Sequence, residues 1–153
     1  QLPMVIDLIS EIRALRSEMN IPLSAKPDLL IRTATKSQFN VIETMKPSLM
    51  KMARIQEVSA IQGEFPPETV ISNLNGFDIG LPLSGILDFK VENLRLNKEI
   101  SISQLEVDKL RKKLSNKGFI DKAPFRVIAE NERRLKAEQG KIEALQSALK
   151  RLG

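Results

Sequence analysis

The sequence predicts an α+β protein, in which a small mixed domain carries an N-terminal helix and a long antiparallel helical hairpin. Three observations support this class. Apolar residues recur at alternating steps of three and four through residues 86–153, which is the spacing of a coiled-coil seam. Residues 1–20 carry one apolar stripe at helical spacing, and residues 23–83 contain short apolar runs separated by turn signals. We therefore expect three parts, at residues 1–22, 23–85 and 86–153.

The first helix is predicted over residues 1–20. Pro3 suits its first turn, where a missing N–H costs nothing, and Pro22 prevents its continuation. Because a complete apolar stripe stands at the start of the chain, we expect a neighbour from outside the chain to pack on this helix. We expect Arg13 and Arg16 to serve the scaffold or a domain interface. The stripe consists of Val5, Leu8, Ile9, Ile12, Leu15 and Met19.

The middle segment predicts the order strand, helix, strand, strand, strand. A strand at residues 29–34 leads to Thr35 and Gln38, which have the spacing of a capping box at a helix start. Pro47 breaks that helix near residue 46, and a second short helix follows over residues 47–53. Residues 54–61 are expected to form a strand. Asn75 and Gly76 join strands 69–74 and 77–81, because both residues tolerate the positive φ of a type I′ turn.

The long hairpin is predicted from two seams that flank a break at residues 116–124. Folding the seams together about this break places Val107 beside Leu135 and Ser103 beside Glu138, which makes one layer polar. A seam of roughly 28 residues per helix would be about 40 Å long at the usual rise of an α-helix. The first seam consists of Ile86, Phe89, Asn93, Leu96, Ile100, Ser103, Val107, Leu110 and Leu114, and the second of Ile128, Asn131, Leu135, Glu138, Ile142, Leu145, Leu149 and Leu152.

The break itself predicts a turn. We expect Gly118 to end the first long helix in the left-handed conformation, because glycine has no Cβ to clash there. We expect Pro124 to lie in the first turn of the second long helix. The structural residues of the turn are then Asn116, Gly118, Phe119, Ala123 and Pro124.

The composition excludes several kinds of chemistry. The chain has 153 residues without Cys or His, so disulfides, thiolate metal sites and a histidine base are excluded. Neither a GxxxxGK[ST] loop nor a GxGxxG motif is present, and the carboxylates are dispersed. We therefore expect no catalytic residue, metal or cofactor in this chain. No apolar run approaches the ~20 residues of a membrane span, and we expect a cytoplasmic protein.

Positive charge is concentrated in the hairpin. Residues 86–153 hold 16 Lys/Arg and 10 Asp/Glu, a net charge of +6, whereas residues 1–85 carry a net charge of −1. This asymmetry indicates a polyanionic partner, although lysine and glutamate also simply keep long helices soluble. Phe119 could stack on an exposed base or pack under the turn. The candidate contacts to a polyanion are Lys109, Arg111, Lys112, Lys113, Lys117, Lys122, Arg126, Arg133 and Arg134.

Three segments resemble one family. Residues 114–124, followed by Val127, Glu130, Glu132, Arg133 and Leu135, resemble the C-terminal hairpin arm of bacterial valyl-tRNA synthetase. Residues 81–88 resemble the segment that leads into that arm. Residues 12–22 resemble the last helix of the anticodon-binding bundle in class I synthetases for branched aliphatic amino acids. The similarity runs in the correct order along the chain.

The resemblance implies a function that composition does not. It implies valine–tRNA ligase, which activates valine with ATP and Mg, transfers it to tRNA and hydrolyses mischarged threonine. The HIGH and KMSKS motifs of its catalytic core are absent here, so the resemblance implies a non-catalytic C-terminal fragment. Its basic arm is expected to hold valine-specific tRNA at the outer corner, near the D and T loops.

Two further expectations concern partners. The rest of the synthetase is expected to pack on the helix at residues 1–20, and the protein is expected to be monomeric and not to bind membranes. The competing hypothesis is a coiled-coil module for dimerisation or protein interaction, with no RNA role.

Overall fold

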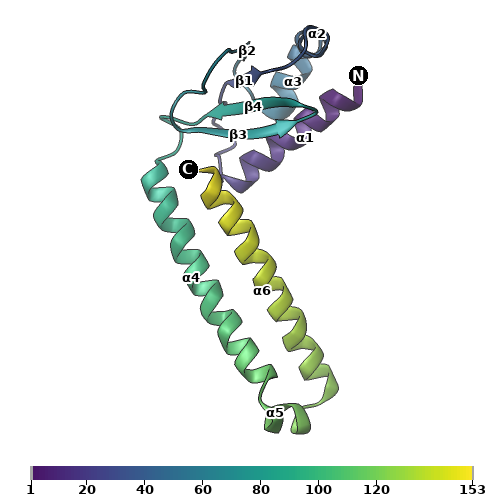
Figure 1. Cartoon of the computed structure of the whole chain (residues 1–153), viewed down its shortest axis with the longest axis vertical. Helices are drawn as coiled ribbons and strands as arrows, with labels where there is room; N and C mark the ends of the chain where they lie inside the picture. Colours follow the sequence, from purple (N-terminus) through teal and green to yellow (C-terminus); the bar gives the residue numbers. More distant parts are fainter. Residues whose placement is uncertain (1, 153) are drawn as a thin grey trace. The chain divides into compact units, whose positions relative to one another are not determined.

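The computed structural model describes residues 2–152 and divides into two compact units, residues 2–89 with Leu152 and residues 90–151 (Figure 1). We call them the first unit and the arm. The first unit contains the helices α1 (Leu2–Glu18), α2 (Lys36–Thr44) and α3 (Lys46–Ala53) and the strands β1 (Leu29–Arg32), β2 (Val58–Ala60), β3 (Thr69–Leu74) and β4 (Phe77–Pro82). The helices α4 (Phe89–Leu114), α5 (Lys117–Lys122) and α6 (Phe125–Arg151) form the arm. This is the predicted α+β class.

The four strands of the first unit form one mixed sheet in the order β2-β1-β4-β3. Strand β1 pairs in parallel with β2, and the helices α2 and α3 connect these two strands. Strand β1 also pairs antiparallel with β4. Strands β3 and β4 form the predicted hairpin, with φ values of 51° at Asn75 and 84° at Gly76. Gly80 has no room for a side chain, because a Cβ there would lie 2.6 Å from the ring of Phe65.

Two local predictions for this unit have different outcomes. The capping box is confirmed, since Thr35 Oγ1 accepts from the Gln38 N–H at 3.1 Å and Gln38 Oε1 accepts from the Thr35 N–H at 2.9 Å. The strand predicted over residues 54–61 is too long. Arg54 has a φ of 54°, and its backbone N–H caps α3 on Met50, so only Val58–Ala60 remains for the sheet.

The apolar stripe of α1 lies inside the first unit. All six of its residues are at most 6% exposed, and α1 packs against α3 and β3 (Figure 1). The stripe is therefore covered by residues of this chain. Our expectation that it needs a neighbour from outside the chain is wrong, because α3 and the sheet already bury it.

The arm is a pair of antiparallel helices, α4 and α6, that lie side by side (Figure 1). The predicted seam residues from Phe89 to Leu149 are all buried or half-buried. An ion pair between Arg134 and Glu106, at 2.7 Å, joins the two helices. Glu106 stands one position before Val107, and Arg134 stands one position before Leu135. The ion pair therefore agrees with the predicted pairing of Val107 with Leu135.

The turn of the arm differs from the prediction at Gly118. This glycine lies inside the short helix α5 and does not have a positive φ. The Asn116 side chain starts α5 by accepting from the Phe119 N–H at 3.2 Å, so the connection needs no left-handed residue. Pro124 lies just before α6, and its carbonyl accepts from the N–H groups of Val127 and Ile128.

Polar groups interrupt the seam of the arm. Ser103 is 1% exposed and Asn131 is 5% exposed. The Asn131 side chain donates to the Val127 carbonyl at 2.7 Å, but its Oδ1, the Ser103 hydroxyl and Glu138 Oε2 have no hydrogen-bond partner among the described residues. None of the helices in residues 2–152 has the length and apolarity that crossing a bilayer requires.

Candidate nucleic-acid interface

One end of the arm carries its entire positive excess. Residues 109–134 contain nine Lys/Arg and three Asp/Glu, a net charge of +6, which equals that of residues 86–153 as a whole. The antiparallel pairing of α4 and α6 brings these residues together around α5 (Figure 1). We call this set the basic tip; it consists of Lys109, Arg111, Lys112, Lys113, Lys117, Lys122, Arg126, Arg133 and Arg134, all exposed.

Three members of the basic tip have partners within the arm. Arg133 pairs with Glu130, and its hydrogen bond holds the pKa of the Glu130 carboxyl below its ordinary value. Arg134 pairs with Glu106 across the two helices. Lys113 Nζ lies 5.0 Å from the centroid of the Phe119 ring. These contacts hold part of the tip in place.

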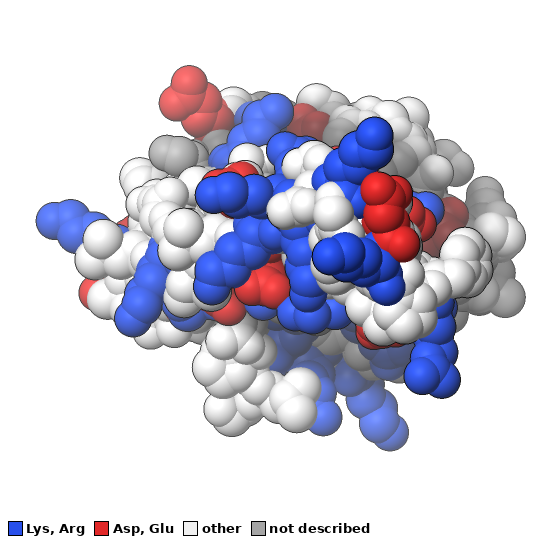
Figure 2. Space-filling model, turned by 90° about the horizontal axis from the view of Figure 1, so that it is seen from below, with Lys and Arg blue, Asp and Glu red and all other residues white. Residues whose placement is uncertain are grey.

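The other six members of the basic tip make no side-chain hydrogen bond or ion pair with the residues that the structure describes. They are Lys109, Arg111, Lys112, Lys117, Lys122 and Arg126. Figure 2, seen from below, shows lysine and arginine side chains predominating over acidic ones near the viewer. Six cations close together without neutralising partners create a local positive potential, which favours a polyanion over a neutral surface.

The two phenylalanines of the tip lie in different environments. Phe119 is half-buried under Lys113, so its ring packs within the turn. Phe125, the first residue of α6, is 85% exposed. Phe125 is not among the contacts predicted from the sequence; it precedes Ile128, where the predicted seam of the second long helix begins.

No group of three or more His, Cys, Asp or Glu side chains within residues 2–152 is placed to hold a metal ion. At the tip, lysine and arginine side chains can form ion pairs and donate hydrogen bonds, and Phe125 presents an exposed aromatic ring. Groups of these kinds bind polyanions such as nucleic acids.

Comparisons with known proteins give one consistent family. Residues 88–153 match the family model described as the valyl tRNA synthetase tRNA binding arm. The chain is 36% identical over 99% of its length to the valine–tRNA ligase of Gluconobacter oxydans. It is 31% identical over 97% of its length to that of Granulibacter bethesdensis, and 30% identical over 97% to that of Bacillus subtilis. The chain spans only 17%, 16% and 17% of the lengths of these relatives.

Proposed function

The chain belongs with the valine–tRNA ligases, with their tRNA binding arm at residues 88–153, and from this premise we propose that its arm holds tRNA at the outer corner of the folded molecule. The observation that carries this proposal is the net charge of +6 at the tip, where six cations have no partner among the described residues. The arm then positions valine-specific tRNA for aminoacylation. ATP-dependent activation of valine, with Mg, belongs to other parts of the whole ligase.

Folded RNA is a suitable ligand for such a tip. Proteins recognise structured RNA largely by its shape and its backbone, because the bases of a helix are hard to reach. A rod that carries cations at one end reaches phosphates without a base-specific pocket. If about four phosphates are neutralised, log K falls against log salt with a slope of about −3. A salt-independent affinity would contradict this electrostatic account.

Phe125 supplies a second kind of contact at the same end of the arm. Its exposed ring is an apolar face of the kind on which a base at the corner of tRNA stacks. Stacking of one base on an aromatic side chain contributes about 1–3 kcal/mol when measured by alanine substitution. We therefore assign base stacking to Phe125, and packing of the turn to Phe119.

Charge reversal at the tip tests the proposal. Lys112→Glu with Lys113→Glu should weaken tRNA binding by at least about tenfold at low salt and make the salt dependence shallower. In the complete ligase the same change should raise the KM for tRNA and leave ATP-dependent valine activation intact. The matched control is Lys141→Glu with Lys150→Glu, which makes the same charge change on exposed residues of α6 away from the tip.

The outcomes separate the proposal from its competitor. Equal losses in the tip variant and its control would mean that total charge matters and the tip does not. Impaired valine activation would mean that the arm serves a different step.

We propose that the protein is monomeric, since the seams of α4 and α6 cover each other. A tight dimer in dilute solution that the tip variant disrupts would favour a protein-interaction module.

A further inference from the structure

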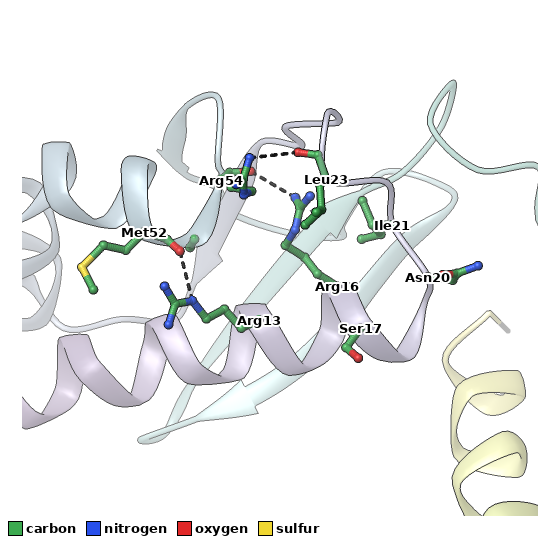
Figure 3. Close-up of a pocket in the computed structure, with 9 residues that line it drawn as sticks. Arg13, Arg16, Ser17, Asn20, Ile21, Leu23, Met52 and Arg54 are labelled. Atoms are coloured by element: carbon green, nitrogen blue, oxygen red, sulfur yellow. Dashed lines mark hydrogen bonds between the residues drawn. The ribbon is translucent and has the colours of Figure 1, made fainter.

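A cavity in the first unit gathers three arginines around one hollow. The cavity has a volume of about 350 Å³, and Arg13, Arg16 and Arg54 line it together with Ser17 and Asn20 (Figure 3). These are three of the eight basic residues in residues 1–85, a segment whose net charge is −1. No acidic side chain is among the described residues that line the cavity. The cluster therefore stands out from the charge of its own unit.

The three arginines also cap backbone carbonyls. Arg16 donates to the carbonyls of Arg54 and Pro22 at 3.1 and 2.8 Å. Arg13 donates to the carbonyl of Met52 at 3.1 Å, and Arg54 to that of Leu23 at 3.3 Å (Figure 3). These bonds satisfy carbonyls at the end of α3 and in the loop after α1. Capping of this kind is a common use of arginine near helix C-termini.

The charge in the cavity exceeds what capping needs. A guanidinium has five N–H donors, yet the three arginines make only these four hydrogen bonds among the described residues. Each helix C-terminus carries about half a negative charge, so the ends of α1 and α3 together leave about two of the three positive charges unopposed. None of the three arginines forms an ion pair with the part of the chain that the structure describes.

Arg16, the most buried of the three arginines, is in an unfavourable environment for its positive charge. Arg16 is only 6% exposed. Burial lowers the pKa of its guanidinium, and the nearby charge of Arg54 lowers it further. A buried cation beside a second cation is unfavourable unless an anion balances them. Arg13 and Arg54 are exposed at the rim, so an anion can reach the cavity from solvent.

We propose that this three-arginine cavity is a second RNA contact, which takes one backbone phosphate of the bound tRNA. Guanidinium groups match the geometry of phosphate oxygens and donate two parallel hydrogen bonds. The inference rests on the proposed tRNA binding, because it adds a contact to that ligand.

Inorganic phosphate is the direct probe of the cavity. Titrated into the ¹⁵N-labelled chain, it should shift the Nε–H signals of Arg13, Arg16 and Arg54 with one saturating curve, and added tRNA should reverse the shift. Acetate at equal ionic strength should have little effect. Shifts that do not saturate, or that acetate reproduces, would overturn the proposal, the latter because the cavity would then accept any carboxylate.

A pair of variants tests the contact with tRNA. Arg13→Gln with Arg54→Gln should weaken tRNA binding by roughly fivefold and reduce the salt slope by about one. Lys36→Gln with Lys51→Gln removes the same charge from exposed residues of the first unit outside the cavity, and should leave the affinity nearly unchanged. Arg16 is left intact because its two bonds support the loop after α1.

The basic tip and the cavity can fail separately. A loss of affinity in the Lys112→Glu, Lys113→Glu tip variant without a loss in the cavity variant would overturn the cavity and leave the arm. The reverse result would overturn the arm and support the cavity as the RNA site. Circular dichroism of the cavity variant should match that of the original chain, so that a loss of binding reports the cavity and not unfolding.

Discussion

Replacing Ser103 by alanine should stabilise the arm, although it removes a polar side chain from its seam. The Ser103 residue is 1% exposed, and its hydroxyl has no hydrogen-bond partner among the described residues. A buried polar group without a partner costs about 1–3 kcal/mol, and we take the lower end for a single hydroxyl. Alanine also has a helix propensity that is more favourable than that of serine by about 0.5 kcal/mol. The expected gain is therefore about 1.5 kcal/mol.

Urea unfolding followed by far-ultraviolet circular dichroism measures this gain. For an m value of about 1–3 kcal/mol/M, the midpoint should rise by roughly 0.5–1.5 M with m unchanged. Ser101→Ala is the matched control, because Ser101 is exposed two positions earlier in the same helix. It gains only the propensity term. The difference between the two variants isolates the cost of burying the hydroxyl.

Equal gains in the two variants would refute this reasoning. They would mean that the Ser103 hydroxyl is satisfied in the folded arm, for example by Glu138, whose Oε2 is the other unpartnered oxygen of the predicted polar layer. A loss of stability in Ser103→Ala would go further and show that this layer is a favourable network. Glu138→Gln would then reproduce the loss.

Two further predictions concern the same arm. Gly140→Ala should stabilise the chain by about 1 kcal/mol, because Gly140 lies inside α6 and a Cβ there meets no atom within 4 Å; a lower midpoint in urea would show that α6 needs the glycine. Phe125→Ala should weaken tRNA binding by about 1–3 kcal/mol without changing its salt slope, whereas Phe119→Ala should lower arm stability. A tRNA affinity that survives Phe125→Ala would remove the stacking contact from the proposal.

Local signals were predictable from the sequence because they depend on few residues. The capping box needs only Thr35 and Gln38, and the tight hairpin turn needs only Asn75 and Gly76; both form as predicted. The seam could be read because its periodicity persists over many turns, so a single polar residue such as Ser103 does not hide it. The buried state of that serine follows from the same period.

Competition between signals explains the predictions that failed. Gly118 is typical of a left-handed helix end, but Asn116, two positions earlier, is a good N-cap residue. The short helix α5 forms from Asn116, and Gly118 lies inside it. The stripe of α1 predicts burial without identifying what covers it. Arg54 is distant in the sequence from Arg13 and Arg16, and only the packing of α1 on α3 brings it to them.

The narrowness of the arm connects its stability to its function. Two helices cover each other on one side only, so eleven of the seventeen predicted seam residues stay partly exposed and the rod buries little apolar surface. Nine cations at one end add repulsion, which the pairs Arg134–Glu106 and Arg133–Glu130 reduce only in part. A polyanion at the tip relieves this repulsion, and any ligand that binds only the folded arm stabilises it by mass action. The cations that weaken the arm alone are thus the groups through which the proposed RNA binding would stabilise the arm.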